Sequence, residues 1–144
     1  MKDNSETQKL LNSVDIPKKM LELDAFSQWL GIEIVEVKEG YCKVQMTIRE
    51  DMLNSMKKAH GGITFSLADT AFGFASNTHG RKAVSIECSI NHIEALEAGD
   101  IITAESEVKS LKNKLGFYNV EVKKQDDLVA LFKGVVYRTS AEWE

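Results

Sequence analysis

The spacing of apolar residues changes twice along the chain, and each change marks a boundary between strand and helix. Between residues 60 and 80, apolar side chains recur at helical spacing and fill a broad arc of the helical wheel. The members of this arc are Ile63, Leu67, Ala68, Ala71, Phe72, Phe74 and Ala75, with Phe65 at its border. Because a helix this apolar must be covered on most sides, the pattern predicts one long helix inside the core.

Alternation of apolar and polar residues, the pattern of strands, occurs on both sides of this predicted helix. Before it lie residues 32–37 and 42–48, with Gly40 between them, which favours an antiparallel hairpin. After it lie four further segments, at residues 84–91, 102–108, 118–122 and 128–137. The last segment is almost continuously apolar, which is typical of an interior strand.

The segment 84–91 has the clearest alternation in the chain. Its apolar positions are Val84, Ile86, Cys88 and Ile90, and its polar positions are Ser85, Glu87, Ser89 and Asn91. A regular strand presents two such sets to opposite sides of a sheet. We therefore expect the apolar set to face the core and Ser85 to lie on the polar face.

A shorter helical pattern precedes the first strand. Its apolar positions are Ile16, Met20, Leu23 and Leu30. Asp15 stands before this run as a candidate N-cap and Gly31 follows it, so the pattern predicts one short amphipathic helix. Phe26 and Trp29 also lie in this segment, and aromatic side chains at this spacing are typical of packing.

The predicted order of elements is two strands, a long apolar helix and four more strands. A single helix must then bury the inner face of one sheet, and an antiparallel sheet curled around the helix is the simplest such α+β arrangement. The pattern alone leaves other folds with a helix on a sheet open. We expect residues 1–15 to form a flexible N-terminus and residues 16–140 to form a single domain.

Composition restricts the class of protein further. The chain has 144 residues, is 43% hydrophobic and has a net charge of -4, which argues against a nucleic-acid partner. No apolar run has the length of a membrane helix, and the first residues lack the apolar core of a signal peptide, so we expect a cytoplasmic protein without a membrane partner. Cys42 and Cys88 are expected to be buried thiols.

Asp69 is the only charged residue inside the predicted central helix. A solvated helix face would normally have several charged residues. Asp69 also lies about two turns beyond the run His60-Gly61-Gly62, where capping and dipole effects have faded. This isolated acid is therefore the first candidate for chemistry.

Three polar or glycine-containing features recur in a defined order around the start of the predicted helix. They are Asn54, the run His60-Gly61-Gly62 and the run Leu67-Ala68-Asp69-Thr70-Ala71-Phe72. The pattern resembles the hotdog-fold acyl-CoA thioesterases of the phenylacetyl-CoA thioesterase (PaaI-like) type. The resemblance extends from about Phe26 to Arg138 and includes the strand VSIECSI. It implies the hotdog fold and hydrolysis of an aryl- or medium-chain acyl-CoA to the free acid and CoA, without a cofactor or a metal.

Physical chemistry and the resemblance together suggest roles for the catalytic candidates. Asp69 is expected to act either as the nucleophile on the thioester or as the general base on water. The glycines open a helix N-terminus to a ligand, with Gly62 as the amide that polarises the carbonyl and Gly61 as a substrate contact. By the resemblance, Asn54 and His60 support these groups, and Ser85 holds a water or the substrate.

Each assignment has a structural alternative. The glycines could serve only the tight entry into the helix, and Asp69 could be tied to Ser66, Thr70 or Gly73. Asn54 could form an Asx turn, and His60 could be a contact at the helix N-terminus.

Asp69 and Gly62 are separated by seven residues of helix, or roughly 10 Å, so one chain cannot bring both to one carbonyl. The family places the carboxylate of one chain against the glycine amide and asparagine of another. The resemblance therefore implies a homodimer with shared active sites, and a tetramer built as a dimer of dimers.

Substrate contacts are expected from two kinds of side chain. The candidate acyl contacts are Phe65, Phe72, Phe74 and methionines, which could equally be core residues, so the acyl group stays open. Phe26 and Trp29 are further candidates that packing also explains. The candidate cations for CoA are Lys57, Lys58, Arg81, Lys82, Lys112 and Lys114. Relatives often have a basic residue and proline where this chain has Glu94-Ala95, which removes one expected cation. His79 and His92 are expected to be solvated.

Two other functions fit the same pattern. One is a non-catalytic acyl-CoA sensor or binding protein, although an acid at position 69 gains nothing in binding an anionic ligand. The other is a hotdog hydratase or dehydratase, which would be expected to use a catalytic histidine beside an acid.

Overall fold

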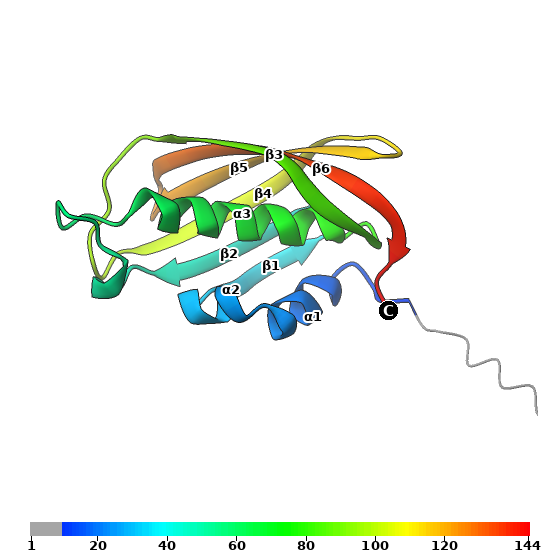
Figure 1. The fold of residues 1–144 in the computed structure, drawn as a ribbon, viewed down its shortest axis with the longest axis horizontal. Helices are drawn as coiled ribbons and strands as arrows, with labels where there is room; N and C mark the ends of the chain where they lie inside the picture. The colour runs from blue at the N-terminus through cyan, green and yellow to red at the C-terminus, as the bar shows by residue number, and fades with distance from the viewer. Residues whose placement is uncertain (1–9) are drawn as a thin grey trace, which may run out of the picture.

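One antiparallel sheet and one long helix make up most of the protein (Figure 1). The computed structural model describes residues 10–144, so most of the predicted flexible segment 1–15 lies outside the described residues. The strands are β1 (Glu33–Lys38), β2 (Tyr41–Thr47), β3 (Arg81–His92), β4 (Ile101–Leu111), β5 (Leu115–Lys124) and β6 (Asp127–Glu142). They form one sheet in the order β1-β2-β4-β5-β6-β3, and every neighbouring pair is antiparallel.

The helix α3 (Gly61–Asn77) lies against the inner face of this sheet and contacts β2, β3, β4, β5 and β6 (Figure 1). Its apolar arc is buried as predicted from Leu67 onward, where Phe72 is only 1% exposed, and Ile63 is half-buried. Burying each large apolar side chain contributes roughly 1.5–3 kcal/mol, so this face holds the sheet around the helix. The predicted curled α+β arrangement is confirmed.

Gly134 allows β6 to lie directly under α3. A Cβ atom at this position would come within 2.7 Å of the Phe72 ring, which is closer than packed carbon atoms approach. The strand therefore needs a glycine where the helix approaches its backbone.

The predicted single helix before the first strand is instead two helices, α1 (Ile16–Leu23) and α2 (Ala25–Leu30). Asp24 separates them because its backbone leaves helical geometry, at φ -100° and ψ 88°. Its carboxylate then accepts a hydrogen bond from Ser27 N at 2.9 Å and caps α2. Asp15, the predicted N-cap, makes no side-chain capping bond.

The expected sidedness of β3 is confirmed for Cys88 and Ile90 but wrong for the residues up to Ile86, because the strand contains a bulge. Ser85 pairs with Val136 and Glu87 pairs with Val135, so Ile86 is an extra residue without a partner. Ala83 packs on the core before the bulge, and Cys88 and Ile90 do so after it. Val84 and Ile86 are 55% and 59% exposed. The alternation therefore reverses at Ile86, and Ser85 belongs to the inner side with Cys88.

A 3-10 turn, η1 (Glu50–Met52), and a loop connect β2 to α3. Leu53 and Ala59 form a β-bridge that closes this loop. Among residues 10–144, none of the helices combines the length and the apolar character that a membrane crossing requires.

Candidate active site

Asp69 lies near the middle of α3 on the side that faces β3 and α2. It is half-buried, and the Cys88 thiol lies 3.9 Å from its Oδ1 as a weak donor. Burial raises the pKa of the Asp69 carboxyl above its ordinary value; the Cys88 thiol opposes this shift and the Asp24 carboxylate adds to it. The central helix thus holds one poorly solvated acid.

The groups that could have tied Asp69 into the helix have other partners. Ser66 Oγ donates to the Gly62 carbonyl at 2.6 Å, and Thr70 Oγ1 lies 3.3 Å from Ser27 Oγ. Gly73 has no side-chain donor for a carboxylate, and its carbonyl accepts from Ser76 and Asn77. Within residues 10–144 the Cys88 thiol is the only hydrogen-bond donor found for Asp69, so the structural alternative for this acid has no support.

The bulge in β3 brings Ser85 and Cys88 to the same side of the strand, where Cys88 contacts Asp69 and the exposed Ser85 neighbours Cys88. Burial and the neighbouring Asp69 raise the pKa of the Cys88 thiol to about 11, and the Ser85 hydroxyl opposes this shift. The thiol is therefore protonated near neutral pH and can donate to the carboxylate. Strict alternation would have placed Ser85 on the far side.

The N-terminus of α3 is capped by His60. Its Nδ1 accepts a hydrogen bond from Gly62 N at 2.8 Å, and its carbonyl accepts from Ile63 N at 2.9 Å. The predicted use of the Gly62 amide as carbonyl polariser therefore conflicts with this cap. Gly61, the first residue of α3, has no hydrogen-bond acceptor for its N–H within the described chain, so it supplies the open amide.

Asn54 holds the loop that leads to His60. Its Oδ1 accepts from Met56 N at 2.9 Å and from Lys58 N at 3.2 Å, and Lys57 adopts a positive φ of 62° in this turn. The Asx-turn alternative is thus present in the structure. It uses only the oxygen, and the side-chain NH₂ group has no acceptor in the described part of the chain.

A hollow of about 320 Å³ lies beside Gly61 and brings several polar groups together. Its polar lining comes from Asn54, Lys58, Thr64, His92 and Glu94. The His92 ring lies over Gly61, where an added Cβ would come within 3.2 Å of Nε2. His92 is exposed as predicted, but the hydrophobic pattern around it contains no sign that it meets the start of the central helix.

The structure leaves the two halves of the predicted site apart within one chain. Asn54, His60 and Gly61 gather at the N-terminus of α3. Asp69 lies roughly 12 Å further along the same helix, with Ser85 and Cys88.

Two of the predicted acyl contacts, Phe72 and Phe74, are core residues that are each 1% exposed. The Phe72 ring meets Tyr118 at 5.7 Å and Phe132 at 5.7 Å between ring centroids. Phe65 is half-buried against Phe132, at 5.3 Å. Phe72 in particular is a core residue, and the structure gives it no surface for a substrate.

The predicted CoA-binding cations fall at opposite ends of α3. Lys57 and Lys58 lie beside its N-terminus, where Lys58 pairs with Glu97 at 2.5 Å. Arg81 and Lys82 begin β3 at the other end, and Lys114 lies in the β4–β5 turn. Arg81 donates to the Asn113 carbonyl, and the Lys82 ammonium lies 5.0 Å from the Trp143 ring.

His79, expected to be solvated, is packed inside the protein with its side chain 7% exposed. Its Nε2 lies 2.8 Å from Tyr118 Oη, and its Nδ1 lies 3.5 Å from a Glu39 carboxylate oxygen. Burial lowers the pKa of the ring. His79 therefore links the end of α3 to the β1–β2 turn.

In the part of the chain that the structure describes, no group of three or more His, Cys, Asp or Glu side chains has the arrangement of a metal site.

Comparison with known proteins identifies the family of this chain. A family model described as the thioesterase superfamily matches residues 56–131. The acyl-coenzyme A thioesterase PaaI of Escherichia coli is 42% identical over 120 residues, which cover 83% of this chain and 86% of that protein.

Solved structures show the same fold. The E. coli PaaI protein from the phenylacetic acid degradation operon superposes with a TM-score of 0.87 at 38% identity, covering 90% of this chain and 95% of that one. A mutant of the phenylacetic acid degradation protein PaaI from Thermus thermophilus gives a TM-score of 0.79 at 37% identity, covering 81% of this chain and 100% of that one. The chain therefore belongs to the thioesterase superfamily and has the hotdog fold.

Proposed function

We propose that this protein hydrolyses an aryl- or medium-chain acyl-CoA to the free acid and CoA, with Asp69 as the reacting carboxylate. The observation behind the proposal is the state of Asp69: a single acid in an apolar helix, partly desolvated and held by one weak thiol donor. Family membership and the PaaI relatives support the thioester substrate. Such an acid keeps free lone pairs for chemistry.

Two reaction routes use the same carboxylate. In the first, an Asp69 oxygen forms a bond to the thioester carbon, the C–S bond breaks and CoA leaves as thiolate; water then cleaves the mixed anhydride. In the second, Asp69 takes a proton from a water molecule that attacks the same carbon. Both routes build negative charge on the carbonyl oxygen.

The start of α3 suits that developing charge. The open Gly61 N–H lies at the positive end of the helix dipole, and a preorganised donor of this kind contributes roughly 3–4 kcal/mol to transition-state stabilisation. Asn54 lines the same hollow, and its NH₂ group, which is not used in the loop, would be the second donor. His60 supports both by holding the Gly62 amide and fixing the turn.

A second copy of the chain is needed to join the two halves. Strand β3 is twelve residues long, lies at the end of the sheet and exposes Val84 and Ile86, which makes it an edge suited to pairing. Two β3 strands paired about a two-fold axis would set two α3 helices antiparallel on one face. Asp69 of one protomer would then face Gly61 and Asn54 of the other. A tetramer and a cytoplasmic location stay predictions of the sequence.

Thiol release from a panel of acetyl-, hexanoyl-, palmitoyl- and phenylacetyl-CoA tests the proposal. We expect turnover of phenylacetyl- or hexanoyl-CoA that increases with enzyme concentration, and little turnover of palmitoyl-CoA. A purified, folded protein that binds these thioesters but releases no thiol from any of them would contradict the proposal and favour a binding protein.

A further inference from the structure

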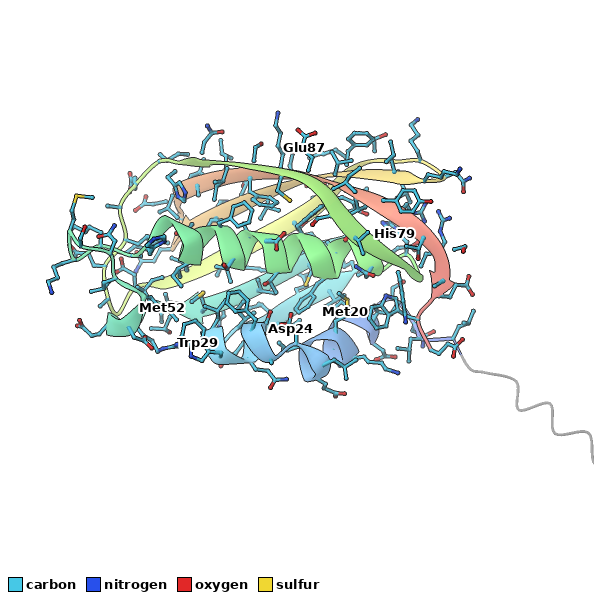
Figure 2. The ribbon with its side chains drawn as sticks, viewed as in Figure 1. Met20, Asp24, Trp29, Met52, His79 and Glu87 are labelled. Atoms are coloured by element: carbon cyan, nitrogen blue, oxygen red, sulfur yellow. The ribbon has the colours of Figure 1, made fainter. Side chains whose placement is uncertain are left out.

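A second hollow, of about 310 Å³, lies on the other side of the α3 N-terminus, between α2, η1 and α3. Its apolar lining comes from Phe26, Trp29, Met52, Leu53 and Ile63. Figure 2 shows Trp29 and Met52 on the side of α3 that faces α2, far from Glu87 on the outer face of the sheet. We call this cavity the aromatic hollow.

The two aromatic side chains of this hollow are more than half exposed. Phe26 and Trp29 are each 54% exposed, yet their rings stack at 6.2 Å between centroids with planes 25° apart. The Arg49 guanidinium lies 5.2 Å from the Trp29 ring and donates to the Leu30 carbonyl at 3.2 Å. The pair is therefore held in place with exposed ring surface.

The two hollows meet at the helix start, and both mix apolar and polar side chains. The hollow beside Gly61 contains Asn54, Lys58 and His92. The aromatic hollow contains Gly62 and the only aromatic pair of the two, and its polar lining is Asp51, His60 and Ser66. An acyl thioester has an apolar acyl group on one side of the carbonyl and a polar amide-containing arm on the other. A carbonyl at the Gly61 N–H would sit where the two hollows meet.

We propose that the aromatic hollow holds the acyl group, and that Phe26 and Trp29 determine a preference for flat aryl acyl groups. The inference rests on the proposed thioesterase function and adds the residues that select the substrate. Its volume of about 310 Å³ is at the low end for small-molecule sites, which suits an acyl group of the size of an aryl ring. Stacking on the aromatic pair favours a ring over an alkyl chain of similar size.

The test compares kcat/KM for phenylacetyl-CoA and acetyl-CoA in wild type, Phe26→Ala and Trp29→Ala. We expect each variant to lose roughly tenfold on phenylacetyl-CoA, as for a truncated apolar pocket, and to change less than about twofold on acetyl-CoA. Leu23→Ala is the matched control, because Leu23 is an apolar residue of the neighbouring helix that is 72% exposed and lies outside the hollow. An unchanged ratio in folded, active variants overturns the inference.

A binding measurement tests the acyl site even if the Phe26 or Trp29 variants fold poorly. It also separates the proposal of an acyl site from the proposal of thioesterase activity. The described chain has Trp29 and Trp143, so an Asp69→Asn, Trp143→Phe background reports on Trp29 alone. Phenylacetyl-CoA should quench its fluorescence, and CoA alone should not. Quenching without turnover by wild type would contradict the thioesterase proposal only. Turnover by wild type without quenching would contradict the acyl site only.

Discussion

At the scale of single residues, the environment of Asp69 separates it from the other polar groups of α3. Its neighbours Ser66 and Thr70 are engaged with a carbonyl and with Ser27, whereas the Cys88 thiol is the only donor to Asp69 among residues 10–144. The isolation of Asp69 could be predicted from the sequence, because the sequence shows a single charged residue within an apolar helix. Its neighbour Ser85 was expected on the wrong face, because a bulge leaves no mark in a two-residue pattern.

Replacing Asp69 with Asn should separate activity from stability. We expect the variant to lose most turnover in the thiol-release assay and to unfold at a higher temperature at pH 7. The structural reason is that burial raises the pKa of the carboxyl, so the folded protein bears a cost for holding it ionised. Scanning calorimetry measures the shift in Tm.

The pH dependence gives the control for this variant. The folded pKa of Asp69 is raised from 3.8, so the cost of ionisation is full above the folded pKa and disappears as pH falls to the unfolded value. The stability gain of Asp69→Asn should therefore shrink as pH approaches 3.8. A gain that stays constant with pH would mean that ionisation is not its cause.

At the scale of elements, the hydrophobic pattern predicted α3 and the strands because burial sets that pattern. It missed the break at Asp24, where a capping carboxylate ends one helix and begins the next within an unbroken apolar spacing. It also missed the contact of His92 with Gly61, since the end of β3 and the start of α3 are brought together only by the curl of the sheet. Local spacing contains no information on such contacts.

Gly134→Ala should destabilise the contact between β6 and α3. The added methyl group would lie 2.7 Å from the Phe72 ring, and overpacking of this kind costs about 1–3 kcal/mol. Urea denaturation measures the free energy of unfolding. Phe72→Leu should rescue part of the loss in the double variant. Additive losses would show that the ring is not the obstacle.

At the scale of the whole molecule, one chain contains each half of the candidate site but not both in one place. The length of α3 makes this predictable, because Gly62 and Asp69 are fixed on one rigid element. Which amide is open was not predictable. The His60 cap on Gly62 depends on the rotamer of one side chain, and it leaves Gly61 as the open donor.

Mixing two inactive variants tests the shared site. Asp69→Ala removes the acid, and Asn54→Asp removes the NH₂ donor while keeping the Oδ1 acceptor that holds the loop. After refolding together, random dimers should regain roughly a quarter of wild-type turnover, because half are mixed and each mixed dimer has one intact site. A mixture of Asp69→Ala with Asp69→Asn is the control and should stay inactive. Mixed dimers, verified by mass spectrometry, without recovery would contradict the shared site.

The bulge at Ile86 also affects how the edge strand tolerates changes in length. Ser85 and Cys88 share one side although they are three positions apart, an odd offset that a regular strand assigns to opposite sides. Deleting Ile86 would leave the same residues turned toward the helix and would straighten the strand locally. Inserting one residue between Glu87 and Cys88 would instead turn the thiol away from the acid. The spacing of residues along β3, as much as its composition, therefore keeps the Cys88 thiol beside Asp69.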